Sequence, residues 1–406
     1  MICHKGPERS IIMTMKITDA LKDKRILIWG YGREGKSTET FIKDHVEVRS
    51  LEVYEGERDG FDLDKYDLVI KSPGIPYFSD DPRFTSQTVL FLNEFRDRTI
   101  GITGTKGKST TSALMYEAIR AAGKKVILLG NIGRPCLDWY DEIEKDTFIV
   151  FELSCHQLAK LEKAPKYAIF LNLFEEHLDY YGTLERYFKA KANITLCQEP
   201  GDVVLLGENV PELKTKAEKH IITKLNQDYI LQIPGAHNKL NAEFVRTMTV
   251  DILGLDLGKV TEGMENFKGL EHRLQFVTKI GNVSFYDDSI STIPEAAISA
   301  AGSVPDTRTM LIGGKDRGID YSKLVAFIKS RKDINFILMY ATGERIFSET
   351  GALPNVIKVT DLDEAVKTAK QITKDGAVLL SPAAASYGYF KNFEERGDRF
   401  KELVRE

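Results

Sequence analysis

The sequence predicts an α/β protein with mainly parallel sheets, divided over three domains. Short apolar runs that are typical of buried strands alternate with helical patterns along the chain, and this alternation indicates βαβ units. A length of 406 residues suggests about two to four domains at roughly 100–200 residues each. Two polar segments, Asn93–Arg98 and Lys268–Arg273, mark the expected boundaries and give domains 1–97, 98–269 and 270–406.

The strands follow from the apolar runs in order. In the first two domains we expect buried strands at Arg25–Trp29, Asp67–Ile70, Thr99–Thr103, Val126–Leu129, Phe148–Phe151 and Ala168–Leu171. A helical pattern at Ser109–Ala122 comes after the third of them. In the last domain, Gly281-Asn282 separates two alternating runs, a hairpin signal, at Gln275–Ile280 and Val283–Tyr286. The later strands are expected at Thr309–Ile312, Asn335–Met339, Val356–Val359 and Ala377–Leu380.

The composition excludes several classes of protein. Hydrophobic residues make up 42% of the chain, too many for a disordered protein. The 56 basic and 60 acidic residues give a net charge of −4, which argues against a dedicated nucleic-acid binder and leaves small anionic ligands open. No apolar run is long enough for a transmembrane helix or a signal peptide. We therefore expect a cytoplasmic protein.

A glycine-rich loop at Gly101–Thr110, GITGTKGKST, carries the strongest local signal. An apolar strand runs into the loop and a helix leaves it, so backbone N–H groups and the helix N-terminus can surround phosphate oxygens. Lys108 can reach a β- or γ-phosphate, and the Ser109 hydroxyl can bind Mg²⁺. Ile102 stands five residues before Gly107, where the general P-loop pattern has glycine. The loop is therefore a subtype of that pattern.

A second glycine-rich loop, Gly30–Gly35 with the sequence GYGREG, follows the strand RILIW. Together with Glu55, twenty residues further on, it is typical of a dinucleotide site. On this motif alone an NAD-dependent dehydrogenase stays open. Ser72-Pro73-Gly74 follows the next strand-like run of the same domain.

The order of these segments resembles one enzyme family, the Mur ligases. The loop Thr-Gly-Thr-x-Gly-Lys-Ser-Thr is similar to the loop of the Mur ligases and of the folylpolyglutamate synthases, which form amides with ATP through an acyl phosphate. Further matches occur in order along the chain: Asn131-Ile132-Gly133, Glu152 in FELSCHQL, His177 in LNLFEEHLDYYGT, Lys191 in YFKAKANI, Asn238 and Asn241 in HNKLNA, Arg273 in EHRL and Asp288 in DDS. The block LLSPAAASYGYFKNFEERGDRF at Leu379–Phe400 resembles the glutamate-adding members.

The resemblance implies a fold and a set of site residues. The fold would be a Rossmann-like N-terminal domain, a central P-loop ATPase-like domain and a C-terminal Rossmann-like domain. The implied ATP-binding residues are Gly104, Thr105, Lys106, Gly107, Lys108, Ser109, Thr110, Asn238, Asn241, Arg273 and Asp288. Those for a UDP-linked substrate are Gly32, Arg33, Glu34, Ser72, Pro73, Gly74 and Asn131.

The resemblance also implies catalytic and metal-binding groups. Lys108, His177 and Lys191 would be catalytic. Two Mg²⁺ sites would draw on Ser109, Glu152, His177 and Lys191. Lys191 would carry a carbamate formed from CO₂, which requires an unprotonated amine and hence a lowered pKa.

Two residues depart from the glutamate-adding pattern in the last domain. Ile290 stands where those enzymes have a lysine, and Arg317 takes the place of a second one. Thr292, Ser386 and Phe393 match the remaining amino-acid contacts. Arg offers a planar fork where Lys is a point charge, so the geometry of the pocket need not match that of the D-glutamate enzymes. We still expect a dicarboxylic amino acid and leave its stereochemistry open.

The resemblance implies an ATP-dependent amide ligase of peptidoglycan precursor synthesis. It would add glutamate, D or L, to UDP-N-acetylmuramoyl-L-alanine, acting as a monomer with no nucleic-acid or membrane partner. Besides the dehydrogenase, two other interpretations stay open: a ligase like folylpolyglutamate synthase, and a P-loop nucleotide-binding protein without ligase activity. The GYGREG domain and the FKNFEERG block argue against the first of these. The second would not need the set Glu152, His177 and Lys191.

Overall fold

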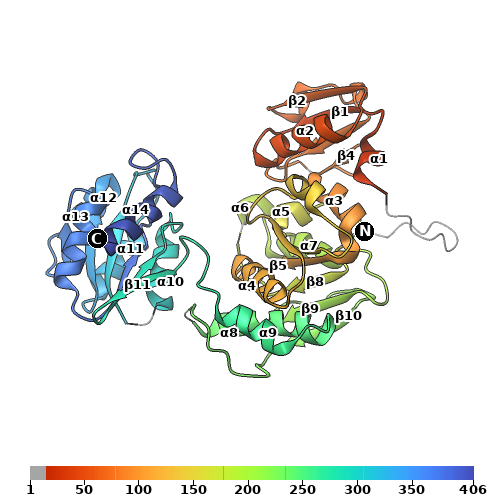
Figure 1. The fold of residues 1–406 in the computed structure, drawn as a ribbon. Helices are drawn as coiled ribbons and strands as arrows, with labels where there is room; N and C mark the ends of the chain where they lie inside the picture. Colours follow the sequence, from red (N-terminus) through yellow and green to blue (C-terminus); the bar gives the residue numbers. More distant parts are fainter. Residues whose placement is uncertain (1–14, 78, 177, 234, 305) are drawn as a thin grey trace. The chain divides into compact units, whose positions relative to one another are not determined.

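A computed structural model describes residues 15–77, 79–176, 178–233, 235–304 and 306–406. Two compact units divide the chain (Figure 1). Unit 1 comprises the residues up to Asp228 together with Leu240–Met264, and unit 2 comprises Tyr229–Lys239 together with Glu265–Glu406. No helix in these described ranges is both long enough and apolar enough to cross a membrane.

The first sheet of unit 1 has four parallel strands in the order β2-β1-β3-β4. The strands are β1 (Arg25–Trp29), β2 (Ser50–Tyr54), β3 (Leu68–Lys71) and β4 (Phe84–Thr85). The helices of this part are α1 (Ile17–Leu21), α2 (Arg33–His45) and α3 (Gln87–Phe95). The apolar run of β1 is buried almost throughout, as expected for a central strand with helices on its faces.

The second sheet of unit 1 has six parallel strands in the order β10-β9-β8-β5-β7-β6. They are β5 (Thr99–Thr103), β6 (Val126–Gly130), β7 (Phe148–Glu152), β8 (Tyr167–Phe170), β9 (Val203–Gly207) and β10 (Glu218–Ile222). The helices are α4 (Lys108–Ala121), α5 (Cys155–Leu158), α6 (Leu178–Tyr181), α7 (Leu184–Ala192), α8 (Ala236–Arg246) and α9 (Leu257–Glu265). The residues of α8 up to Lys239 and the last residue of α9 belong to unit 2. Phe91 of α3 packs edge-on against Phe151 of β7, so the two sheets share one apolar core.

Unit 2 contains a six-stranded sheet in the order β11-β12-β16-β13-β14-β15, with only the β11–β12 pair antiparallel. The strands are β11 (Gln275–Ile280), β12 (Val283–Asp287), β13 (Thr307–Gly313), β14 (Asn335–Met339), β15 (Val356–Lys358) and β16 (Gly376–Leu380). The helices are α10 (Pro294–Ser303), α11 (Ser322–Ser330), α12 (Tyr340–Thr350), α13 (Leu362–Ile372) and α14 (Phe393–Arg405). Two separate apolar cores form between the sheet and its helices, one with α10–α12 and one with α13 and α14.

The α/β fold with mainly parallel sheets is confirmed. The strand expected at Thr99–Thr103 and the hairpin around Gly281 occur as predicted, the latter ending one residue later, at Asp287. The interpretation from the sequence missed β2, β4, β9 and β10. The domain boundaries after residues 97 and 269 remain a proposal, and the structure divides into the two units described above.

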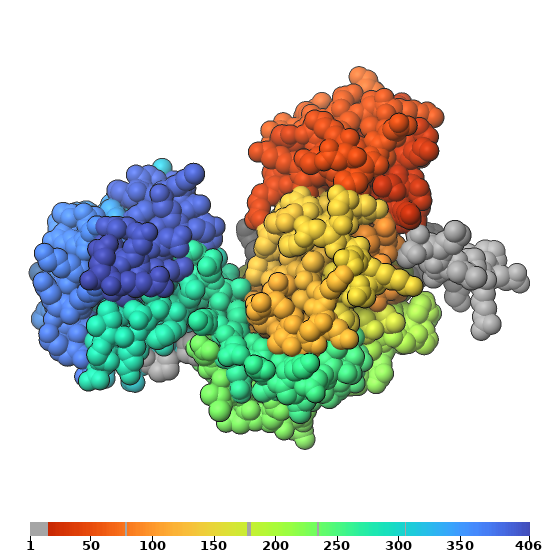
Figure 2. Space-filling view, in the orientation of Figure 1, coloured from red at the N-terminus to blue at the C-terminus, as the bar shows by residue number. Residues whose placement is uncertain are grey.

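The C-terminal helix α14, the darkest blue atoms of Figure 2, lies on the surface of unit 2. At Gly397 its backbone comes close to the side chains of His272 and Asp287. A Cβ atom there would lie 2.0 Å from His272 Nδ1 and 2.6 Å from Asp287 Oδ2. We therefore expect Gly397→Ala to destabilise unit 2 by about 1–3 kcal/mol, the usual cost of overpacking. Denaturant unfolding measures this effect.

Gly302→Ala is the matched control, because Gly302 lies in α10 and a Cβ there would meet no atom within 4 Å. It should be neutral or stabilise by up to about 1 kcal/mol. Equal stability of the Gly397→Ala variant and the unsubstituted protein would contradict the close packing of α14.

Candidate functional site

The loop between β5 and α4 is built on two glycines with positive φ. Gly104 has φ 157° and Gly107 has φ 84°, and the value at Gly107 is one that residues with a Cβ rarely adopt. A Cβ at Gly107 would also lie 3.0 Å from Asn241 Oδ1 of α8. The amide of Thr105 donates to the carbonyl of Asn172 (3.0 Å), and the amide of Lys106 donates to the side-chain oxygen of Asn172 (2.9 Å). The loop is therefore held by the segment after β8 and lies close to α8.

Two lysines donate to one carbonyl of this loop. Lys108 Nζ lies 2.9 Å from the carbonyl oxygens of Gly104 and Thr105. Lys191 Nζ, from α7, lies 2.7 Å from the same oxygen of Gly104, and Lys191 is only 1% exposed. Burial and then the positive charge of Lys108 lower the pKa of Lys191 to about 7, and burial lowers the pKa of Lys108.

A buried carboxylate ends the neighbouring strand β7. Glu152 Oε1 accepts a hydrogen bond of 2.8 Å from Asn131 Nδ2. Glu152 Oε2 is buried and has no hydrogen-bond partner within the described part of the chain. An anionic oxygen left unpartnered in the interior is costly, so Glu152 suits a hard cation such as Mg²⁺.

Four further predicted residues of the ATP site lie on two helices, and Asn238 is the one of them that belongs to unit 2. Ser109 and Thr110 occupy the first turn of α4 and are half-buried. Asn238 and Asn241 lie three residues apart on α8, hence on one face of the helix. His177 lies outside the described residues. Within the described ranges no group of three or more His, Cys, Asp or Glu side chains could hold a metal ion.

In the second glycine-rich loop, before α2, the carbonyl of Gly30 lies close to both Ser72 and Gly35. Ser72 Oγ donates to the carbonyl of Gly30 (3.0 Å), and a Cβ at Gly35 would lie 2.1 Å from that carbonyl oxygen. Gly32 caps the helix that begins at Arg33, so the amides of its first turn are free of helical partners. Arg33 donates to the carbonyl of Gly133, in the segment that follows Asn131.

Glu34 does not face an open loop. Gln157 Nε2 donates to Glu34 Oε1 at 2.9 Å, and Glu34 Oε2 is buried without a hydrogen-bond partner in the described residues. Burial raises the pKa of Glu34 to about 7. Glu34 therefore connects α2 to α5. Its side chain already has a partner within the protein, although it was predicted to bind the UDP-linked substrate.

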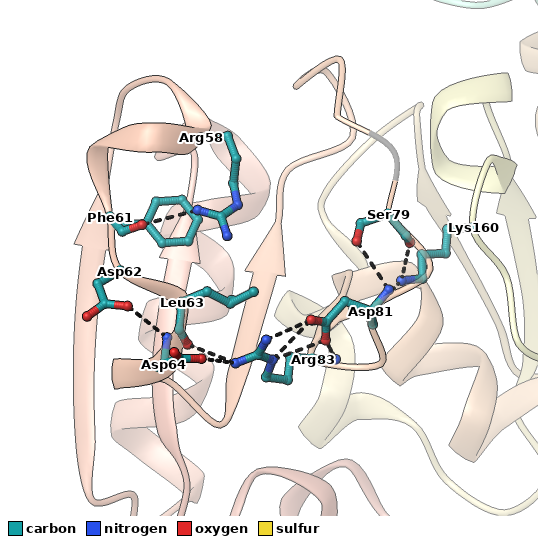
Figure 3. A network of polar contacts seen from close by, with 9 residues as sticks. All are labelled: Arg58, Phe61, Asp62, Leu63, Asp64, Ser79, Asp81, Arg83 and Lys160. Atoms are coloured by element: carbon teal, nitrogen blue, oxygen red, sulfur yellow. Dashed lines mark hydrogen bonds and ion pairs between the residues drawn. The ribbon is translucent and has the colours of Figure 1, made fainter.

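A lysine from the segment after α5 holds the chain that follows Ser72-Pro73-Gly74 (Figure 3). Lys160 Nζ donates to the carbonyls of Ser79 (2.9 Å) and Asp81 (3.1 Å). The side chain of Asp81 pairs with Arg83 at 2.8 Å, and Arg83 also pairs with Asp64 at 3.0 Å. These contacts fix one wall of a cavity of about 210 Å³, which Pro73 lines together with Lys71, Tyr77, His156 and Tyr180.

In unit 2, Asp288 follows β12 and is buried. It accepts hydrogen bonds from Ser381 Oγ (2.7 Å) and from the amide of Leu274 (3.2 Å). Burial raises its pKa to about 6. Arg273 is exposed and lies just before Leu274. Of the predicted nucleotide contacts, Arg273 and Asp288 thus lie at the same edge of the sheet of unit 2.

The four predicted amino-acid contacts lie in unit 2, in segments that follow β12, β13 and β16. Arg317 Nη2 donates to the carbonyl of Thr292 (2.7 Å). Phe393 begins α14, and its carbonyl accepts from Ser289 Oγ (2.8 Å). Ser386 is buried in the loop before α14. Because parallel strands end at one edge of a sheet, these segments meet there.

Interpretation of the sequence missed several residues that hold these segments in place. Gln157 could have been found from the sequence, because Ser154 and Gln157 have the spacing of a capping box, which the structure contains. No sequence pattern indicated a role for Arg396. It is fully buried and donates to Ser289 Oγ (2.9 Å), to the carbonyl of Ser289 (2.7 Å) and to that of Ala384 (3.0 Å).

The fold and the loop define an α/β protein with a P-loop for nucleotide phosphates. Residues 102–245 match the family of the Mur ligase middle domain. A UDP-N-acetylmuramoylalanine–D-glutamate ligase from Aquifex aeolicus is 33% identical, over 94% of this chain and 98% of that protein. A UDP-N-acetylmuramoyl-L-alanine–L-glutamate ligase from Salinispora tropica is 31% identical, over 97% and 99%. The chain belongs to the Mur ligase family.

Solved structures show the same fold. The UDP-N-acetylmuramate–alanine ligase from Thermotoga maritima has a TM-score of 0.58 at 21% identity, over 94% of this chain and 99% of that one. A MurF ligase from the same organism, in complex with ADP, has a TM-score of 0.57 at 16% identity, over 98% of both chains.

Proposed function

We propose that the chain is an ATP-dependent ligase that joins glutamate to UDP-N-acetylmuramoyl-L-alanine in peptidoglycan precursor synthesis. The observation that carries the proposal is the near full-length similarity to glutamate ligases of this substrate. The loop of Gly104 and Gly107, with Lys108 beside it, supplies groups for ATP phosphates, and Glu152 supplies a carboxylate for Mg²⁺. We expect the enzyme to act in the cytoplasm as a monomer.

The chemistry requires an activated carboxylate. The terminal carboxylate of the acceptor attacks the γ-phosphorus of ATP, ADP leaves, and an acyl phosphate forms. The amine of glutamate then attacks the acyl carbon, loses a proton and expels phosphate. In phosphoryl transfer a protein acts mainly by positioning and by stabilising charge, and Lys108 with the amides of the first turn of α4 fits this role.

Ser109, Glu152, His177 and Lys191 would hold Mg²⁺. The unpartnered Oε2 of Glu152 supports this assignment for the described residues. Bound Mg²⁺ neutralises the charge that develops on the transferred phosphoryl group.

Lys191 would bind its metal as a carbamate. The amine attacks the carbon of CO₂ and releases a proton, which converts a buried cation into an anion. A pKa of about 7 favours this reaction, because much of the amine is then unprotonated near neutral pH. The carbamate would also remove the repulsion between two ammonium groups that donate to one carbonyl.

The enantiomer of glutamate is decided by experiment, because relatives of both kinds match over nearly the whole chain. The test is release of ADP with UDP-N-acetylmuramoyl-L-alanine and each enantiomer in turn. We expect turnover with one glutamate enantiomer and none with lysine or diaminopimelate. Turnover with only the latter two would refute the proposal, as would ATP hydrolysis that does not depend on an amino acid.

A further inference from the structure

One cation expected beside the amino acid is missing from unit 2. Ile290 occupies the position of a lysine in the glutamate-adding pattern. Ile290 is half-buried, and its amide donates to the carbonyl of His272 (3.1 Å). Position 290 therefore supplies no charge for either carboxylate of glutamate.

Lys315 places another cation near the predicted contacts. It follows β13, and its amide donates to the carbonyl of Ala385 (2.9 Å), the residue before Ser386. Its side chain is exposed and its Nζ lies 4.7 Å from the ring centre of Tyr387. Tyr387 is itself 48% exposed, so the ammonium group lies on an open surface.

Lys315 and Arg317 are two residues apart and have no acidic partner in the described part of the chain. The acid between them, Asp316, pairs instead with Arg345 at 3.2 Å and accepts from the amide of Gly318 (2.8 Å). Both side chains are exposed, so one short segment offers two cations that suit the two carboxylates of one glutamate.

We propose that Lys315 is a specificity-determining residue that binds one carboxylate of glutamate while Arg317 binds the other. Lys315 thereby supplies the charge that Ile290 does not. The inference rests on the proposed glutamate ligation, and it assigns to Lys315 a role that the family pattern does not give to this position.

The test compares Lys315→Met with the unsubstituted enzyme in steady-state ADP release. We expect the KM for glutamate to rise by about 10- to 100-fold, since one hydrogen bond between charged groups is lost. The KM values for ATP and for the UDP-linked substrate should stay unchanged. Lys315→Arg should keep a KM for glutamate close to that of the unsubstituted enzyme.

Lys332→Met is the matched control, because Lys332 is exposed and lies before β14, at the opposite end of the strands. It should leave all three KM values unchanged. An unaltered KM for glutamate in Lys315→Met, or an equal rise for all three substrates, would overturn the inference. If the unsubstituted enzyme releases no ADP with either glutamate, the proposed function itself fails and the inference falls with it.

Discussion

Replacing Glu152 with glutamine should lower the rate of ADP release by about 100-fold or more. A metal ion contributes several kcal/mol of charge stabilisation, and each 1.4 kcal/mol corresponds to a factor of ten. The amide keeps the shape of the side chain and its contact with Asn131, but it removes the negative charge at Oε2. Initial rates over a Mg²⁺ titration should show a higher half-saturating concentration.

The folded state should tolerate this substitution, because Glu152 Oε2 is a buried acceptor with no partner among the described residues. We therefore expect the thermal midpoint of Glu152→Gln to equal or exceed that of the unsubstituted protein. Glu144→Gln, at an exposed residue that pairs with Lys125, should retain full activity. Full activity with unchanged Mg²⁺ dependence in Glu152→Gln would remove this residue from the metal site.

Replacing Lys191 with methionine should also lower the turnover rate by about 100-fold, the upper range for disturbed metal ligation. With ¹³C-labelled bicarbonate, the unsubstituted protein should show a carbamate carbon signal that the variant lacks. The signal should grow as pH rises through about 7, because the Lys191 amine loses its proton there. A lysine of ordinary pKa would be unprotonated in only about one molecule in a thousand near neutral pH.

Lys189→Met provides the matched control on the same helix. Lys189 is exposed and pairs with Glu185 at 2.8 Å, so neither activity nor the carbon signal should change. Full activity of Lys191→Met in buffers freed of bicarbonate would exclude a catalytic carbamate. A carbon signal that persists in Lys191→Met would place the carbamate on another amine.

The sequence was most informative where one short segment determines its own structure. Thr99–Thr103 is a buried apolar run, and Gly104 and Gly107 supply the positive φ values of the loop after it. The strand β2 was missed because its sequence, SLEVY, is only partly buried and has a weak pattern. β9 was missed although all five of its residues are buried.

Contacts between distant segments could not be predicted from the sequence alone. Lys191 and Gly104 are 87 residues apart, and Gln157 and Glu34 are 123 residues apart. Such pairs depend on how complete sheets and helices pack, which no local pattern specifies. The resemblance to a family could indicate that Lys191 has a role, but it could not indicate that this amine donates to the loop of Lys108.

The shared acceptor at Gly104 has a consequence for titration. Lys108 and Lys191 both donate to its carbonyl oxygen, and the charge of Lys108 lowers the pKa of Lys191. The acid limb of a pH–rate profile will therefore report the loss of the Lys191 proton at a pH that depends on the charge of Lys108 as well as on burial.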